Sequence, residues 1–195
     1  MAFLTIARVW FWRFAGRACT ICLLAFLVPR AVAANPATPA AEYQLKAVFL
    51  FNFAQFAEWP EKAFTDARAP LVIGLLGEDP FGAYLDDLVK DEKIDTHPLQ
   101  VRRFATIEDA TPCHILFISR SEATHLGNIV AQLKGRSILT ISDADTFTRA
   151  GGMVRFVTES GKIRLRINVE AAKACNLTIS SKILRPATIV TAGKD

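Results

Sequence analysis

The stretch that most constrains how this chain can fold is residues 42–60, which read EYQLKAVFLFNFAQFAEWP. It contains no glycine, and proline occurs only at its end, so it predicts a helix of about five turns that stops at Pro60. Apolar side chains recur at helical spacing and form one broad stripe, as in a helix that packs against a core. The stripe comprises Leu45, Phe49, Leu50, Phe53, Phe56 and Ala57.

The other side of this helix is also partly apolar. Phe51 falls there among polar residues, and Val48 and Trp59 flank it. Either the helix is covered on all sides within its own domain, or its second face packs on another protein. We predict that helix 42–59 supplies a self-association or partner-binding face. Its main residues are Phe51, Gln55, Glu58 and Trp59.

Residues 1–34 have the order of a secretory signal peptide. Arginines precede an uncharged apolar run, 18–28, and small residues follow at 31–34. The apolar run is too short to span a bilayer, although a retained membrane anchor is the alternative. We therefore predict export with cleavage of residues 1–34, a mobile leader over 35–41 and a single domain over 42–190.

The charge of the chain changes once this peptide is set aside. Four of its 23 basic residues and none of its 19 acidic residues lie in 1–34, so the remainder is formally neutral. A neutral domain has no broad electrostatic field to attract nucleic acid. We expect no nucleic-acid partner.

Apolar runs alternate with helical patterns along residues 71–141. This spacing predicts βαβ units and a mainly parallel sheet. The predicted strands are 71–77, 98–104, 113–119 and 136–141, and the predicted helices between them are 79–90 and 122–133.

The pattern changes after residue 150. Residues 153–158 and 162–168 predict an antiparallel hairpin, followed by a short helix over 169–175 and a last helix over 179–190. The fold class predicted is therefore α/β. We expect a single domain, a three-layer-like sandwich with a mainly parallel mixed sheet, a C-terminal antiparallel hairpin and flanking helices.

The sequence shows no set of residues that would catalyse a reaction. Cys113 and His114 are neighbours on a predicted strand, so their side chains point to opposite faces and cannot act as a pair. The three histidines show no metal-binding spacing, and no phosphate-binding glycine loop is present. We predict that the protein is not an enzyme and holds no cofactor or metal.

Three charged residues follow the carboxyl ends of predicted parallel strands, where ligands of such sheets usually bind. They are Asp79, Arg120 and Asp143, and together they would line a small polar crevice. Aspartate at such positions is also a usual helix cap, which is the interpretation we favour. The alternative function is a sensor module that binds a small polar molecule in this crevice.

Five segments, in order and at matching spacing, resemble the YfiR family of small bacterial periplasmic proteins. They are residues 45–60, 75–82, 113–119, 151–154 with Ile167-Asn168, and 183–184, within a match over roughly 42–190. The resemblance implies a periplasmic inhibitor that binds the periplasmic sensor region of an inner-membrane diguanylate cyclase. It would thereby lower cyclic di-GMP, with effects on biofilm formation and exopolysaccharide.

The resemblance also implies partners and a redox feature. An outer-membrane lipoprotein would capture and so release the inhibitor, and a homodimer is expected. Many relatives carry a cysteine where this chain has Val72, placed to bridge the strand of Cys113. Since Val72 cannot form that bridge, Cys113 is either a buried free thiol, which we favour, or paired with Cys175.

Overall fold

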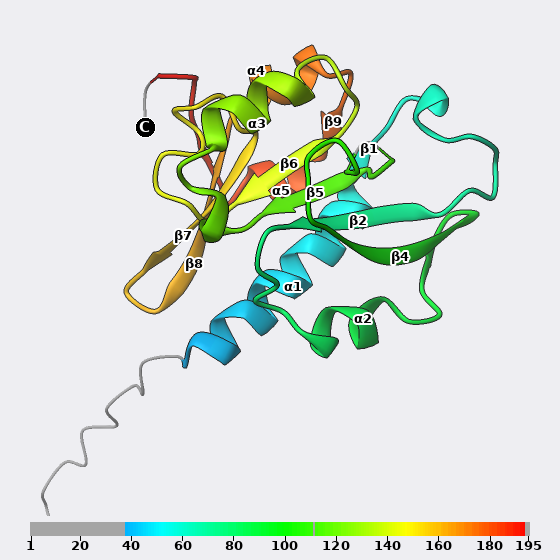
Figure 1. The fold of residues 1–195 in the computed structure, drawn as a ribbon, viewed down its shortest axis with the longest axis horizontal. Helices are drawn as coiled ribbons and strands as arrows, with labels where there is room; N and C mark the ends of the chain where they lie inside the picture. Colours follow the sequence, from blue (N-terminus) through cyan, green and yellow to red (C-terminus); the bar gives the residue numbers. More distant parts are fainter. Residues whose placement is uncertain (1–37, 111, 194–195) are drawn as a thin grey trace, which may run out of the picture. The chain divides into compact units, whose positions relative to one another are not determined.

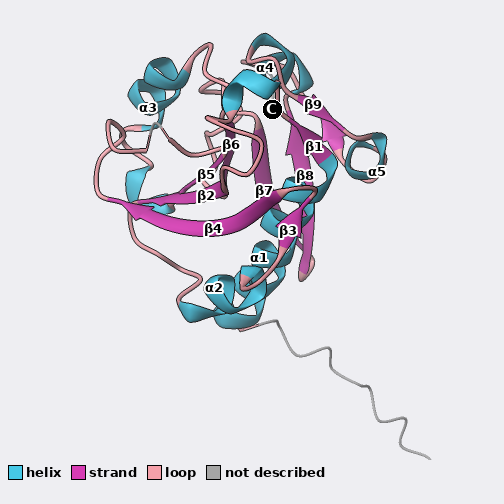
Figure 2. Ribbon diagram, turned by 90° about the vertical axis from the view of Figure 1, so that its right-hand side faces the viewer, coloured by secondary structure: helices cyan, strands magenta, loops and turns pink. Residues whose placement is uncertain are grey.

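The computed structural model describes residues 38–110 and 112–193. The predicted signal peptide, 1–34, and residues 35–37 of the predicted leader lie outside the described residues. The described chain forms one α/β domain in which a central sheet has helices on both faces (Figures 1 and 2). The predicted fold class is confirmed.

The first helix, α1, spans Pro39–Phe56. It begins earlier than predicted because the Thr38 hydroxyl accepts a hydrogen bond from the Ala41 amide at 3.3 Å and Pro39 occupies the first turn. It also ends earlier, because the chain straightens into β1 (Ala57–Glu58) and pairs antiparallel with β9 (Thr178–Ile179). Trp59 therefore lies beyond the helix, in the loop that leads to the sheet.

The main sheet runs in the order β10-β8-β7-β6-β5-β2-β4-β3. Its middle strands, from β4 to β7, are parallel. β2 and β5 are buried along their whole length, as the continuous apolar runs predicted. The strands are β2 (Leu71–Leu76), β3 (Lys93–Ile94), β4 (His97–Phe104), β5 (Ile115–Ile118), β6 (Leu139–Ser142), β7 (Val154–Glu159), β8 (Lys162–Ile167) and β10 (Thr188–Ile189).

The predicted hairpin is β7 and β8, which pair antiparallel from Val154 opposite Ile167 to Glu159 opposite Lys162. Ser160 and Gly161 form its turn with φ angles of 51° and 72°. Positive φ at both central residues is the mark of a type I′ turn, whose twist suits a two-residue hairpin.

The helices form two outer layers. α1 and α2 (Ala83–Val89) cover one face of the sheet, and α3 (Leu126–Leu133) covers the other (Figures 1 and 2). The shorter helical segments are η1 (Glu61–Ala63), η2 (Arg120–Glu122), α4 (Val169–Ala174) and α5 (Ser181–Leu184). The larger apolar cluster includes the buried face of α1, and the smaller one lies under α3.

The last predicted helix, 179–190, is wrong. Only α5 is helical there, and Thr188–Ile189 form β10, which pairs parallel with β8. Pro186 and the β-branched residues after it disfavour a helix, and the open edge of β8 offers backbone hydrogen bonds instead. Local apolar spacing did not reveal that edge.

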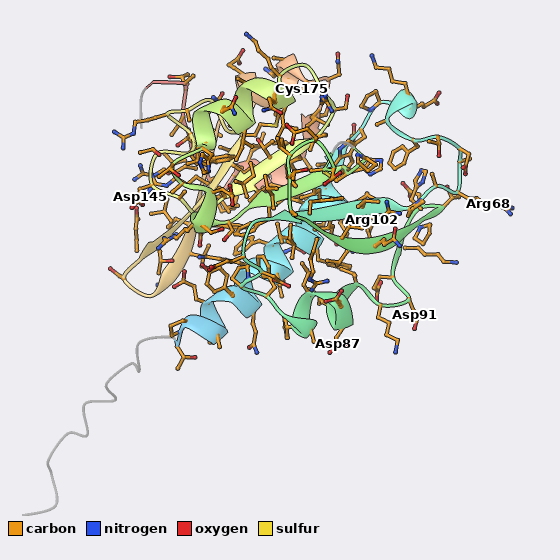
Figure 3. All side chains as sticks on the ribbon, in the orientation of Figure 1. Arg68, Asp87, Asp91, Arg102, Asp145 and Cys175 are labelled. Carbon is orange, nitrogen blue, oxygen red and sulfur yellow. The ribbon has the colours of Figure 1, made fainter. Side chains whose placement is uncertain are left out.

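Both cysteines of the described domain are free and buried. Cys113 belongs to the cluster under α3, whereas Cys175 follows α4 and belongs to the larger cluster (Figure 3). The Cys113 thiol donates to the Ala110 carbonyl at 2.9 Å, and burial raises its pKa to about 12. The buried free thiol favoured from the sequence is therefore what the structure shows.

Candidate functional site

The outward face of α1 carries apolar side chains. Leu45 is 45% exposed, and Val48 and Phe51 are half-buried on the same side, with Gln55 exposed beyond them. We call Leu45, Val48, Phe51 and Gln55 the outer strip. Leu45 was assigned to the buried stripe from the sequence, which was wrong. Lys46 is fully buried instead.

Trp59 is fixed where the chain leaves β1. Its indole N–H donates to the His114 carbonyl at 3.1 Å, and its ring meets the His114 ring edge-on at 6.3 Å. Glu58, the residue before it, is exposed. The short β1–β9 pairing thus turns the two residues away from the helix and toward the following loop.

Aromatic rings of three segments stack beside Trp59. Phe64, from the loop after η1, lies between two histidines, with ring centroids 4.4 Å from His114 and 3.9 Å from His97. Both pairs are nearly parallel, at 20° and 17°. The stack joins the loop to the start of β4 and to the residue before β5.

His114 holds this loop against β2. Its Nδ1 accepts a hydrogen bond from the Val72 amide at 3.1 Å, so the proton lies on Nε2, which donates to the Ala63 carbonyl at 3.1 Å. Burial lowers the pKa of His114, the Ala63 carbonyl opposes this, and repulsion from His97 adds to the lowering. The neutral imidazole therefore holds the loop to the start of β2, although His114 itself is distant from both in sequence.

A cleft of about 590 Å³ opens between this loop and the β3–β4 turn. The hydroxyl of Thr96 donates to the Ala67 carbonyl, and His97 Nδ1 donates to the Ala69 carbonyl at 2.7 Å. These bonds tie the two walls together. We call this space the acidic cleft, and the residues that define it are Glu58, Trp59, Glu61, Phe64, Asp66 and Asp95.

The charge of the acidic cleft is one-sided. Four carboxylates line it, and no lysine or arginine of the described chain does. None of the four forms a salt bridge within residues 38–110 and 112–193. Arg68 belongs to the same loop, but its side chain points outward from the edge of the molecule (Figure 3). The cleft therefore presents unpaired negative charge beside aromatic rings.

The predicted partner-binding residues divide between these two surfaces. Glu58 and Trp59 line the acidic cleft, whereas Phe51 and Gln55 belong to the outer strip. The two surfaces meet at the end of α1, because Gln55 of the outer strip and Glu58 of the cleft are both exposed and only three residues apart. Sequence reasoning missed Phe64, which follows η1, and Asp95 and His97, which lie in the β3–β4 turn and at the start of β4, because these residues show no periodic pattern.

The predicted crevice is partly assembled. Arg120 Nε donates to the Asp143 carbonyl oxygen at 3.2 Å and lies 3.5 Å from Asp143 Oδ1. Asp143 Oδ2 accepts from Lys46 Nζ at 2.6 Å and from the Tyr43 hydroxyl at 2.9 Å. The side chains of Lys46 and Asp143 are each only 1% exposed. The space at the strand ends is therefore filled by α1.

Glu42 completes this polar cluster. Its carboxylate lies 2.6 Å from Lys46 Nζ and accepts from the Thr158 hydroxyl at 3.0 Å. Burial raises the pKa of Glu42, but hydrogen bonds from Lys46 and Thr158 outweigh it, and the net pKa is lowered. Burial, with the adjacent Asp143 carboxylate, raises the pKa of Tyr43 to about 12. We call Glu42, Tyr43, Lys46 and Asp143, together with the exposed Arg120 at their edge, the buried polar cluster.

Asp79 has other partners. Its Oδ1 accepts from the backbone amides of Phe81 and Gly82, at 2.7 and 3.1 Å, in the turn before α2. Its Oδ2 accepts from Arg103 Nε at 2.8 Å. The structure thus brings Arg120 and Asp143 together and places Asp79 in a separate ion-pair group with Arg103 on β4.

The described residues contain no group of three or more histidine, cysteine and acidic side chains placed to hold a metal ion. Cys113 faces the cluster under α3 while His114 faces Phe64, so the two side chains diverge as predicted. No helix in the described part of the chain is long and apolar enough to cross a membrane.

Comparison with known proteins adds one finding. A sequence model of the family described as YfiR/HmsC-like matches residues 43–188, which include the outer strip, the acidic cleft and the buried polar cluster except Glu42. A search of curated proteins found no match.

Proposed function

Because the chain belongs to the YfiR/HmsC-like family, we propose that it is a periplasmic regulatory protein that binds the sensor region of an inner-membrane diguanylate cyclase. Binding holds the cyclase inactive and lowers cyclic di-GMP. The protein acts stoichiometrically, by a higher affinity for the inactive conformation of the cyclase than for the active one. It carries out no chemical step itself.

One observation supports this proposal most directly. The outer strip and the acidic cleft form a continuous surface at the end of α1 that combines apolar, aromatic and charged side chains. Such a mixture is typical of protein-binding surfaces, whose energetic centres are enriched in aromatic residues. Phe51, Gln55, Glu58 and Trp59 are its proposed contact residues.

Two further partners belong to the same proposal. An outer-membrane lipoprotein that captures the protein would release the cyclase by competition for this surface. The protein is also proposed to form a homodimer, and light scattering of the purified protein tests that state. A disulfide at position 72 plays no part in the release, because Val72 stands there and Cys113 is a free thiol.

The central experiment is a binding titration between the exported protein and the purified periplasmic region of a membrane diguanylate cyclase from the same genome. We expect Gln55→Arg and Phe51→Asp to abolish or strongly weaken binding. Gln55 is exposed, so its replacement leaves the core unchanged. Gln132→Arg, an exposed glutamine on α3, is the matched control and should bind normally.

Thermal unfolding of each variant separates binding from folding. Loss of binding by a folded Gln55→Arg protein, with normal binding by Gln132→Arg, supports the proposal. Unchanged cyclic di-GMP after deletion of the gene, together with no cyclase binding, would refute it. If Phe51→Asp alone fails to fold, Phe51 belongs to the core. The binding of Gln55→Arg then tests whether the outer strip contacts the cyclase.

A further inference from the structure

The acidic cleft is lined by four carboxylates and by no lysine or arginine of the described chain. Glu58 and Glu61 lie on one wall and Asp95 lies on the turn opposite, so a group inserted between them meets carboxylates on both sides. Within the described domain none of these carboxylates has a salt-bridge partner. A positively charged group bound between them is attracted by all of them.

The walls of the acidic cleft also favour a positively charged group. Trp59 offers an aromatic ring, and a guanidinium or ammonium group gains about 0.5–2 kcal/mol on the face of such a ring. The Phe64 ring, stacked between His97 and His114, adds its edge to the wall. The Trp59 ring is already oriented by its hydrogen bond to the His114 carbonyl, so its side chain loses little conformational entropy when a ligand binds.

The cleft also has room for a side chain. Ala54 and Ala57 lie at its inner end, and their short side chains leave the space open. Its volume of about 590 Å³ falls within the range of about 300–1,000 Å³ typical of binding pockets. Ile94, which is half-buried, adds apolar surface beside the charges, which favours a ligand with both basic and apolar parts.

From these features we propose that the acidic cleft binds a basic and partly apolar peptide segment of the partner protein. An arginine or lysine side chain lies against Trp59, between the carboxylates, and an apolar neighbour packs on Ile94. The occupant is a peptide because the cleft continues into the outer strip, which a small cation would leave uncovered. This inference rests on the proposed function and names the chemistry of its partner.

Trp59 provides a direct reporter. The other two tryptophans of the chain, Trp10 and Trp12, lie in the predicted signal peptide, so the exported protein carries Trp59 alone. The probe is a short capped peptide of arginine and phenylalanine, without tryptophan or tyrosine, titrated while Trp59 emission is recorded. A Trp59→Phe protein shows that any change in emission comes from this residue.

The test variant is the double substitution Glu58→Gln with Asp95→Asn, which removes charge and keeps the shape of both side chains. Asparagine is suitable at position 95 because the backbone there has a φ of 53°, which asparagine tolerates. The matched control is Glu170→Gln with Asp87→Asn, both exposed and outside the cleft. Each protein is titrated with the peptide and with the cyclase periplasmic region.

We expect the peptide to shift Trp59 emission, the shift to weaken at high ionic strength, and the cleft variant to bind about tenfold more weakly than the control. A peptide with glutamate in place of arginine should not bind. Equal binding of the acidic peptide, or unchanged affinity in the cleft variant, overturns the inference. Free arginine binding as tightly as the peptide also overturns it, since the occupant would then be a small cation.

The two probes separate the inference from the proposed function. If the cyclase region binds equally to the cleft variant and to its control, the proposed function stands and the inference is overturned. If the peptide binds through the cleft but no cyclase region binds, the cleft chemistry stands and the proposed function is overturned.

Discussion

The charged side chains at the two ends of α1 lie in opposite environments: those at its start are paired and buried, and those beyond its end are exposed. Near its start, Lys46 and Asp143 are buried in contact at 2.6 Å, with Glu42 and Tyr43 bonded to the same pair of groups. At its end, the carboxylates of the acidic cleft face solvent without a salt-bridge partner in the described chain.

The difference indicates what each end does. A buried charge must be paired, since leaving it unpaired in the interior is costly, so the buried polar cluster fixes α1 against the ends of β5 and β6. An exposed set of like charges does not stabilise the fold, and it contributes favourable free energy only when a ligand of opposite charge binds to it. The first end should therefore respond to mutation through stability, and the second through binding.

The largest effect is expected at the buried end. Lys46→Met removes the buried partner of Asp143 and should lower the free energy of unfolding by about 3–5 kcal/mol, because the buried carboxylate is left with only the longer ionic contact to the exposed Arg120. Urea-induced unfolding measures this change. Glu58→Gln at the other end is the control and should change stability by less than about 0.5 kcal/mol. Equal effects of the two substitutions would remove the distinction between the ends.

A smaller loss is expected when one hydrogen bond of the same cluster is deleted. Tyr43→Phe keeps the ring that meets Phe81 at 5.6 Å but loses the hydroxyl bonded to Asp143. The unfolding free energy should fall by about 1.5 kcal/mol, as for a hydrogen bond to a charged group. Tyr84→Phe alters the exposed tyrosine of α2 and should be neutral. Similar stability of both variants would contradict the structural role of the cluster.

The stability of the protein should depend on pH through His114, which holds one wall of the acidic cleft against β2. Burial lowers the pKa of His114 in the folded protein, so the unfolded chain takes up a proton first as the pH falls. This group therefore lowers stability on acidification from about pH 7 toward the folded pKa, by at most about 1.4 kcal/mol per pH unit. His114→Gln should flatten the pH dependence of the unfolding free energy. His125→Gln, an exposed histidine on the other face of the sheet, should leave the slope unchanged, and an equal slope in all three proteins would contradict this account.

The smallest loss of stability is expected when an exposed ion pair is removed. Arg103 lies 2.6 Å from Asp86, and its guanidinium lowers the pKa of Asp86, yet both side chains are 43% exposed. Asp86→Asn should destabilise the protein by less than about 1 kcal/mol at low ionic strength, because solvent and salt screen the pair. A loss as large as that of Lys46→Met would show that burial does not decide the strength of these pairs.

The sequence predicted the sheet well and the helix faces less well. Continuous apolar runs gave β2 and β5, and the Ser160-Gly161 pair between two alternating segments gave the hairpin, because these signals are local. The burial of Lys46 had no local signal. It depends on Asp143, which is distant in sequence, and helical periodicity alone places a lysine outside.

The candidate site shows the same limit. Glu58 and Trp59 were predicted from the excess of apolar side chains on one helix, although β1 carries both beyond the helix end. Phe64 and Asp95 come from a loop and a turn whose sequences contain no repeating pattern. They meet only because β2 and β4 are adjacent parallel strands, which no single segment reveals.

Hydrogen–deuterium exchange of the protein with and without the cyclase periplasmic region compares the two ends of α1 in one experiment. The account predicts that binding slows exchange in residues 58–67 and 93–97, around the acidic cleft, and leaves residues 42–46 unchanged. Slower exchange confined to α3, with residues 58–67 and 93–97 unaffected, would contradict it.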